Sequence, residues 1–388
     1  MFFPPISVPL SGERLTVTYH ITASGPDEAH ERAVNAALEE TVELPASLVP
    51  PGDMQSVVGH VERVEPLEAD RYAAVITYPV EVTSFELTGL LSVVYGNISM
   101  QDGIRVVGLE LPESLLKAFS GPRFGRAGLR ALVDAPHRPL LGTAIKPAGF
   151  PTDKLAEFAY QFALGGIDIV KEDHGLTNQP TAPFGERVFA CAEAVRRANE
   201  ETGGSALYVA HITGPADQIV ERALMAREAG AGGIEVITGL AGYDTLRLLT
   251  EDERIGLPVF AHPAMLGVYT LSRDHGIALG VLYGQIVRLA GADATIYTNW
   301  GGRFPTRRED TAQLKELIAR PERHIKPILP MPGGGMTLER VPEILEHYGP
   351  EIILLISGGL FGIGPDLVEN CRRFREVVEQ TAATAPDN

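Results

Sequence analysis

A dense group of polar residues follows one apolar run in the middle of the chain. The run Ile167-Asp168-Ile169-Val170 has the composition of a buried strand, and it leads directly into Lys171-Glu172-Asp173-His174. A lysine, two carboxylates and an imidazole cannot all be buried without partners, so they must pair, face water or bind a metal. Oxygen ligands such as Asp173 suit Mg²⁺, which keeps waters and leaves room for a substrate. A solvated Lys–Asp–Glu network is the alternative.

Other chemically capable residues stand at the ends of further apolar runs. Lys146 follows Gly142-Thr143-Ala144-Ile145, and His211 and His262 each follow a later run. A lysine beside apolar neighbours can be tuned for acid–base work, although an ordinary salt bridge also explains its position. The two histidines are either hydrogen-bonded structural residues or members of the same site as the polar group above.

Two glycine-rich turns are candidates for binding a phosphate. Gly333-Gly334-Gly335 and Ser357-Gly358-Gly359 each follow an apolar run. Glycine lets backbone N–H groups come close to a phosphate, but either triplet alone could be a tight turn. As a pair in the last two loops they favour phosphate binding. Arg303 and Trp300, the only tryptophan, lie in a further glycine-rich loop that is either a lid over an anionic substrate or a surface turn.

The elements that must position these residues form a repeating pattern. From about residue 139 onward, eight short apolar runs occur, each followed by a helix-like segment. Eight βα units predict a closed parallel (β/α)8 barrel, with an open doubly wound sheet as the alternative. The carboxyl ends of barrel strands carry the chemistry, and the polar residues stand at those ends. The predicted strands are 140–145, 167–170, 206–210, 233–237, 258–261, 292–297, 327–331 and 352–356.

The first part of the chain lacks this repeat and predicts a small α+β domain of the ferredoxin-like type, with a pair of helices on one sheet. We therefore divide the chain into an N-terminal domain, residues 1–120, and a barrel domain, residues 121–388, joined by the compact segment Gly121-Pro122-Arg123-Phe124-Gly125. Alternating apolar residues and helix-start signals predict the elements of the first domain. These are strands at 15–21, 57–61, 72–79 and 104–109, and helices at 27–40 and 85–94.

Composition excludes several classes of protein. The 388 residues contain no run of about 18 apolar residues, so we expect no membrane span. Met1-Phe2-Phe3-Pro4-Pro5 lacks the charged and apolar regions of a signal peptide. The two cysteines, Cys191 and Cys371, lie in helix-like segments, which fits a reducing cytoplasm. A net charge of −17 argues against nucleic acid or an anionic membrane as the main partner, but not against a small anionic substrate.

The order of these motifs resembles the large subunit of ribulose-bisphosphate carboxylase and its RuBisCO-like (form IV) relatives, over most of the chain. The resemblance implies that Lys146 serves proton transfer and that a carbamylated Lys171 binds Mg²⁺ together with Asp173. It places His262 on the histidine of the fifth strand and Arg303 on the cation of the closing loop. It also implies one phosphate cradle, formed by Gly334, Gly335, Ser357, Gly358 and Gly359.

The resemblance extends to the first domain. Glu39 and Asn97, the latter in Tyr95-Gly96-Asn97, match residues that reach into the active site of a neighbouring subunit. The implied assembly is a homodimer with two-fold symmetry in which each site is shared between the two chains.

The chain departs from the carboxylase pattern at positions that change the expected chemistry. Ala148-Gly149 replace the second lysine of the first strand motif, and His174 replaces the last acidic magnesium ligand, where we keep it as a third ligand. Pro263, Ile296 and Gly333 replace three residues that would bind a second phosphate. The resemblance therefore implies a substrate with a single phosphate and an enzyme that does not fix CO₂.

The expected function is Mg²⁺-dependent enolate or enediolate chemistry on a phosphorylated keto sugar acid. We favour decarboxylation, or transcarboxylation with hydrolysis, of a 3-oxo acid phosphate such as 3-oxoisoapionate 4-phosphate, because loss of CO₂ itself generates the enolate and needs fewer lysines. One alternative is an enolase or isomerase of a methylthio-ketose phosphate in methionine salvage. Others are a catalytically retired sugar-phosphate-binding protein and an unrelated phosphate-binding barrel such as an aldolase.

Overall fold

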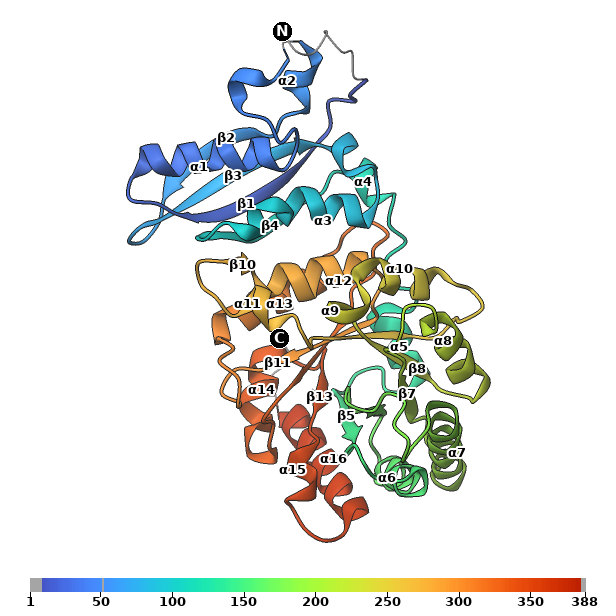
Figure 1. Ribbon diagram of the computed structural model, residues 1–388. Coiled ribbons are helices and arrows are strands. Elements are labelled where there is room, and N and C mark those ends of the chain that lie inside the picture. The colour runs from blue at the N-terminus through green and yellow to red at the C-terminus, as the bar shows by residue number, and fades with distance from the viewer. Residues whose placement is uncertain (1–8, 51, 385–388) are drawn as a thin grey trace. The chain divides into compact units, whose positions relative to one another are not determined.

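The computed structural model describes residues 9–50 and 52–384, so the first five residues, on which the signal-peptide expectation rests, lie outside the described part. The chain forms two compact units (Figure 1). One comprises Met1–Ser120 together with Leu266–Ile286, and the other comprises Gly121–Met265 together with Val287–Asn388.

The first unit is built on a five-stranded sheet with the strand order β10-β4-β1-β3-β2. Its central strand β1 alternates strictly between partly exposed and buried residues, which is the period of a strand with one covered face. The helix that follows it, α1, buries a row of alanines. The elements are β1 Arg14–Thr22, α1 Pro26–Glu39, α2 Asp53–Val57, β2 His60–Pro66, β3 Arg71–Pro79, α3 Leu87–Tyr95, β4 Ile104–Glu110, α4 Glu113–Leu116, α11 Gly267–Thr270 and β10 Gly276–Ile277, with 3₁₀ turns at Ala46–Leu48, Val80–Thr83 and Asn97–Met100 and a π-helix at Gly280–Ile286.

Two features of this sheet differ from the sequence prediction. The strand predicted at 57–61 was placed too early in the chain, because α2 runs to Val57 and the edge strand β2 begins only at His60. The exposed residues of β2 are mostly polar, so this edge strand carries no apolar alternation that could mark it. Strand β10 has two residues, pairs in parallel with β4 and comes from a segment far along the chain, for which the sequence offers no periodic signal.

The second unit confirms the (β/α)8 prediction. Its eight strands form one parallel sheet in the order β12-β11-β9-β8-β7-β6-β5-β13, a nearly closed barrel with helices outside it (Figure 1). The strands are β5 Leu140–Ile145, β6 Ile169–Glu172, β7 Leu207–His211, β8 Gly233–Ile237, β9 Val259–His262, β11 Ala294–Thr298, β12 Leu329–Gly333 and β13 Ile353–Leu355. The helices are α5 Gly125–Leu132, α6 Thr152–Leu164, α7 Phe184–Thr202, α8 Ile219–Glu228, α9 Thr238–Ala241, α10 Tyr243–Glu251, α12 Val287–Leu289, α13 Arg308–Ala319, α14 Val341–Tyr348, α15 Gly358–Phe361 and α16 Leu367–Thr384, with a 3₁₀ turn at Leu338–Arg340.

Several barrel strands begin and end one or two residues later than predicted. In β6 the ladder includes Lys171 and Glu172, because Lys171 pairs with Ala144 on one side and with Val209 on the other. A polar side chain does not end a strand whose backbone still has partners on both sides. As a result, the polar residues are held by the barrel wall itself.

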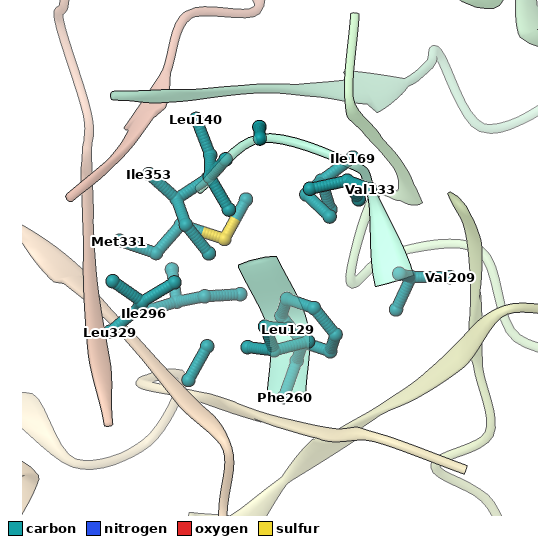
Figure 2. Close-up of a cluster of buried hydrophobic side chains, with 12 residues drawn as sticks. Leu129, Val133, Leu140, Ile169, Val209, Phe260, Ile296, Leu329, Met331 and Ile353 are labelled. Atoms are coloured by element: carbon teal, nitrogen blue, oxygen red, sulfur yellow. The ribbon is translucent and has the colours of Figure 1, made fainter. Parts of the chain in front are cut away.

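The amino-terminal end of the barrel is closed by an apolar cluster (Figure 2). Leu129 and Val133, in and just after α5, lie among side chains from the beginnings of the strands. The strand members of the cluster are Leu140, Ile169, Val209, Phe260, Ala294, Ile296, Leu329, Met331 and Ile353. Packing one end with hydrocarbon gives the barrel its stability and leaves the carboxyl ends free for polar residues.

Helix ends and cysteines fit this architecture. Helix α7 ends at Gly203 in the left-handed conformation, the usual way for a chain to leave a helix. No helix in the described part of the chain is long and apolar enough to cross a membrane. Cys191 and Cys371 are buried free thiols, and burial raises the pKa of Cys371 to about 12, so neither is a reactive thiolate at neutral pH.

Candidate active site

Four of the predicted site residues meet at the carboxyl ends of β5, β6 and β9. The Lys146 ammonium lies 3.2 Å from Asp173 Oδ2, and His174 Nδ1 lies 3.4 Å from the other oxygen of the same carboxylate. The rings of His174 and His262 are stacked, with centroids 4.5 Å apart and an angle of 21° between their planes. The barrel topology brings these side chains together, since neighbouring parallel strands end at the same face.

Both imidazoles are held in the neutral form. Burial, followed by the positive charge of Lys171 and the neighbouring His174 and His211, lowers the pKa of His262 well below its usual value. Burial also lowers the pKa of His174, and Lys171, Lys146 and Arg303 reinforce this effect against the opposing charge of Asp173. Burial would raise the pKa of Asp173, but a hydrogen bond from the Gly175 N–H and the two lysines outweigh it, so the pKa is lowered. The site therefore combines a carboxylate with uncharged imidazoles.

A second polar group lies inside the barrel on β6, β7 and β8. Lys171 Nζ is 2.9 Å from Glu235 Oε2, and both side chains are almost completely buried, with 3% and 0% exposure. Lys171 also donates a hydrogen bond of 2.5 Å to the carbonyl oxygen of Glu172. His211 Nδ1 is 3.8 Å from Glu235 Oε1, and burial lowers the pKa of His211 to about 3, so its ring carries no charge.

Glu235 was missed by the sequence prediction. It stands in the apolar run Gly233-Ile234-Glu235-Val236-Ile237, and burial raises its pKa to about 7 in spite of Lys171. A carboxylate in a fully buried strand is rarely tolerated without a partner, so its position within the run is a signal that could have been used.

Glu172 anchors the polar segment to the helix that follows it. Its carboxylate accepts hydrogen bonds from Arg187 Nε at 2.6 Å, from the Tyr208 hydroxyl at 2.7 Å and from the His211 backbone N–H at 3.0 Å. Arg187 is itself completely buried and also donates to the carbonyl oxygens of Ala182 and Thr177. Glu172 therefore has a structural role, whereas its neighbours in the sequence, Lys171 and Asp173, belong to the candidate site.

The loop after β11 is packed against the glycines after β12. The Arg303 N–H donates to the Gly334 carbonyl oxygen at 3.3 Å, and a Cβ on Gly302 would lie only 2.0 Å from that oxygen. Gly334 and Gly335 have φ values of +86° and +100°, which side-chain-bearing residues rarely adopt. The close approach of the two loops thus requires glycine, and it sets the position of Arg303.

Trp300 holds the base of the same loop. Its ring lies 4.5 Å from the ring of His347 and 5.6 Å from that of Tyr348, centroid to centroid. The guanidinium groups of Arg308 and Arg340 lie 5.6 and 5.9 Å from its centroid, within the range of cation–π attraction. Trp300 therefore anchors the loop against α13 and α14.

The turn after β13 is open on the side where a ligand could approach. A Cβ on Gly358 would meet no atom within 4 Å, whereas one on Gly359 would lie 2.9 Å from the Met336 carbonyl oxygen. The Ser357 hydroxyl donates to the Ala144 carbonyl oxygen at 3.2 Å, which ties this turn to the end of β5. This geometry leaves room for a phosphate beside Gly358.

In the first unit, Asn97 is held by two consecutive glutamates at the end of α1. Asn97 Nδ2 donates to Glu39 Oε1 at 2.9 Å. Glu40 accepts hydrogen bonds from the backbone N–H groups of Gly96 and Ile98, on either side of Asn97. Glu39 and Asn97 thus come together as a pair, and Glu40, which sequence reasoning did not single out, supports the turn between them.

Comparison with known proteins decides the family. Residues 126–369 match the model of the ribulose bisphosphate carboxylase large chain, catalytic domain. The crystal structure of the Rubisco-like protein from Rhodopseudomonas palustris superposes with a TM-score of 0.86 at 37% identity, over 95% of this chain and 98% of that one. The chain belongs to the RuBisCO large-chain family.

Named relatives place it among the RuBisCO-like proteins and not among the carboxylases. It is 35% identical over 364 residues to the 5-methylthioribulose-1-phosphate isomerase of Rhodospirillum rubrum, covering 93% of this chain and 95% of the relative. It is 32% identical over 309 residues to the 2,3-diketo-5-methylthiopentyl-1-phosphate enolase of Geobacillus thermodenitrificans, covering 79% of this chain and 75% of the relative.

The departures of this RuBisCO-like chain from the carboxylase pattern have structural counterparts. Ile296, where the resemblance to the carboxylases implies a phosphate-binding histidine, is 4% exposed and belongs to the apolar cluster of the barrel. Gly333 is the last residue of β12, and a Cβ there would lie 2.9 Å from the Leu355 side chain. Neither position offers a polar side chain to a second phosphate.

The donor set of this site fits Mg²⁺ under one condition. In the described part of the chain, no three His, Cys, Asp or Glu residues gather closely enough to hold a metal ion. A carbamate on Lys171 would add anionic oxygens beside Asp173, and Mg²⁺ needs only one or two carboxylates together with water and substrate. Asp173 and a carbamylated Lys171 would therefore hold the ion, with His174 adjacent, and Lys171 must first leave Glu235.

Proposed function

We propose that this RuBisCO-like protein moves a proton between adjacent carbons of a phosphorylated keto sugar, as an isomerase or enolase of a methylthio-ketose phosphate. The names of the relatives support this reaction class, which the sequence prediction held as its alternative. They do not support decarboxylation or transcarboxylation of a 3-oxo acid phosphate, which the sequence prediction favoured.

The observation that carries the proposal is the arrangement of Lys146, Asp173 and the two neutral imidazoles. An ammonium group and unprotonated ring nitrogens lie beside one carboxylate, so a proton donor and a proton acceptor are available within one small site. General acid–base catalysis of enolisation needs such a pair.

The hydrogen bonds suggest a separate role for each imidazole. His262 Nδ1 accepts the Ala264 N–H at 3.2 Å, so the neutral ring carries its proton on Nε2 and can donate it to a substrate oxygen. In His174, Nδ1 faces the Asp173 carboxylate, which leaves Nε2 as the free acceptor for a carbon-bound proton. Lys146 can return a proton to the neighbouring carbon.

A Mg²⁺ ion held by Asp173 and a carbamylated Lys171 would stabilise the negative charge of the enediolate. The Arg303 cation and the turns with Gly334, Gly335 and Ser357–Gly359 would hold the single phosphate. Glu39 and Asn97 would complete the site of a partner subunit, which makes a homodimer the proposed active assembly.

The test is a substrate panel monitored by NMR in D₂O with bicarbonate and Mg²⁺. Deuterium should enter a methylthio-ketose phosphate without loss of carbon, and Lys171→Met should abolish the exchange. The matched control Lys154→Met, at an exposed lysine on α6, should leave it unchanged. Carbon loss from a phosphorylated 3-oxo acid alone would establish the decarboxylase. Absence of turnover and of Mg²⁺ binding would make a catalytically retired sugar-phosphate-binding protein the leading interpretation.

His174 has two proposed roles that predict different results. If it is the base, His174→Gln should abolish exchange while Mg²⁺ affinity, measured by calorimetry, stays the same. If it is a metal ligand, as the sequence predicted, the same change should weaken Mg²⁺ binding about 10-fold or more.

A further inference from the structure

Glu40, the residue directly after α1, accepts hydrogen bonds from the backbone on both sides of Asn97. Its Oε1 accepts the Ile98 N–H at 2.6 Å, and its Oε2 accepts the Gly96 N–H at 3.1 Å. The residue is only 9% exposed. Each carboxylate oxygen serves a different backbone donor, an arrangement that requires the ionised form, because protonation turns one of the two acceptor oxygens into a donor.

The turn of residues 96–98 fits closely around this carboxylate. A Cβ on Gly96 would lie 2.7 Å from Glu40 Oε2 and 2.3 Å from the Ser92 carbonyl oxygen, so the backbone can approach the carboxylate only because residue 96 is glycine. The Ile98 side chain is completely buried and fixes the other end of the turn. Asn97 lies between these two points, so its place depends on both hydrogen bonds to Glu40.

Glu39, the last residue of α1, acts on the side chain of the same asparagine. Asn97 Nδ2 donates to Glu39 Oε1 at 2.9 Å. Because a carboxylate only accepts hydrogen bonds, the amide nitrogen of Asn97, and not its amide oxygen, faces Glu39. Two consecutive carboxylates therefore hold Asn97, one through its side chain and the other through its backbone.

We propose that Glu40 is a positioning residue of the shared active site, whose carboxylate holds the turn of residues 96–98 and so places the Asn97 amide for a substrate in the barrel of a partner subunit. This inference rests on the proposed function, in which Asn97 completes a partner's site. A neutral carboxylic acid would release one of the two N–H groups. Protonation of Glu40 should therefore loosen the turn and slow the reaction.

The surroundings of Glu40 place this protonation near neutral pH. Burial raises the pKa of Glu40 to about 7. The two backbone hydrogen bonds oppose this effect, whereas the negative charges of Glu39 and Glu43 add to it. Glu40 should thus be ionised above about pH 7 and protonated below it.

The other titratable groups around Glu40 contribute no competing charge. Tyr19 on β1 and Tyr78 on β3 interact with its carboxylate, and burial raises the pKa of both hydroxyls, so they stay neutral. On α3, the Tyr95 hydroxyl donates instead to a carbonyl oxygen of β4. On β2, His60 is exposed and pairs with a neighbouring glutamate. The 3₁₀ turn 97–100 has no titratable side chain.

The first experiment observes the turn directly, without substrate. Asn97-Ile98 is the only Asn-Ile pair in the sequence. Full-length protein labelled with ¹³C-carbonyl asparagine and ¹⁵N-isoleucine therefore gives one correlated amide signal in NMR, that of Ile98. In the wild type this signal should shift with pH, with a midpoint near 7, because its acceptor gains a proton. In Glu40→Gln, which keeps the size of the side chain, the titration should be lost.

Two further variants separate Glu40 from its neighbours. Glu39→Gln should keep the titration with a lower midpoint, since the charge of Glu39 raises the pKa of Glu40. Glu31→Gln, at an exposed glutamate of the same helix, should leave the titration unchanged. If Glu40→Gln does not fold, Glu40→Met takes its place. A wild-type signal that does not move across neutral pH, a titration that persists in the Glu40 variant, or one that is lost in Glu39→Gln would overturn the proposal.

Turnover gives an independent readout of the same residue. The wild-type rate should fall as the pH drops through about 7, and Glu40→Gln should lower kcat by up to about 100-fold, the cost of a misplaced group. Mixed dimers of Glu40→Gln with Lys171→Met should regain activity, because one of their two sites contains neither change. Mixed dimers of Glu40→Gln with Asn97→Ala should stay inactive, since every site then contains one change.

The two proposals fail in different ways. If mixed dimers of Asn97→Ala with Lys171→Met regain activity but those of Glu40→Gln with Lys171→Met do not, the site is shared and Glu40 does not act through it. If the Ile98 signal titrates as expected and the wild type turns over no methylthio-ketose phosphate, the proposed substrate is wrong while Glu40 still holds the Asn97 turn.

Discussion

The buried pair of Glu172 and Arg187 makes the clearest prediction about stability. Both side chains are completely buried, and Glu172 accepts two hydrogen bonds from the guanidinium, at 2.6 and 3.2 Å. Changing Glu172 to Met leaves a buried guanidinium without its counter-charge and deprives the Tyr208 hydroxyl of its acceptor. Removing one member of a buried ion pair destabilises a protein by about 3–5 kcal/mol.

The expected shift in melting temperature follows from the size of the barrel unit. A loss of 1 kcal/mol lowers the melting temperature by about 2–4 °C for 150–250 residues, so Glu172→Met should lower it by about 6–20 °C. The assay is calorimetry, supported by urea unfolding followed by circular dichroism. The control is Arg196→Met, which breaks an exposed pair with Glu193 on α7 and should change stability by less than about 0.5 kcal/mol.

A double variant distinguishes charge compensation from simple loss of contacts. Glu172→Met with Arg187→Met removes both charges, so it should be no less stable than either single variant. If the two single effects instead add in the double variant, or if Glu172→Met costs less than about 1 kcal/mol, charge compensation between Glu172 and Arg187 does not hold the polar segment in place.

Three further predictions concern the site. Asn97→Ala should abolish turnover without changing the unfolding of the barrel. If the site is shared between two chains, mixed dimers of Asn97→Ala with Lys171→Met should regain activity. An unchanged rate in Asn97→Ala removes this residue from the site. Gly358→Val should raise KM and leave the melting temperature unchanged, because a Cβ at this position meets open space. Gly335→Ala should instead lower the stability, because the φ of Gly335 is +100°. An unchanged KM for Gly358→Val counts against a phosphate beside Gly358. Burial lowers the pKa of His211 to about 3 in the folded state. Below about pH 6.5 the unfolded chain therefore binds a proton at His211 that the folded chain does not. The free energy of unfolding should fall as the pH falls below about 6.5, by up to about 1.4 kcal/mol per pH unit. His211→Asn should flatten this part of the pH–stability curve, and an identical curve would show that His211 does not titrate on unfolding.

Much of the architecture was already determined by local sequence patterns. Repeated apolar runs such as 140–145 and 233–237 predicted the barrel strands, because a strand buried on both faces must be continuously apolar. Short or exposed strands were misplaced or missed by the prediction. β2 and β10 bury too little apolar surface to leave a period, and their place depends on partners elsewhere in the chain.

The sequence also determined which residue types stand at the strand ends, and hence that Lys146, Asp173, His174 and His262 lie at one face of the barrel. It did not determine how those residues pair. The pairing of Lys171 with Glu235 arises because β6, β7 and β8 lie side by side in a fixed register, which brings together residues far apart in the chain. Only the tertiary structure decides such pairings, since burial makes each charge depend on whichever partner the barrel places within about 3 Å of it.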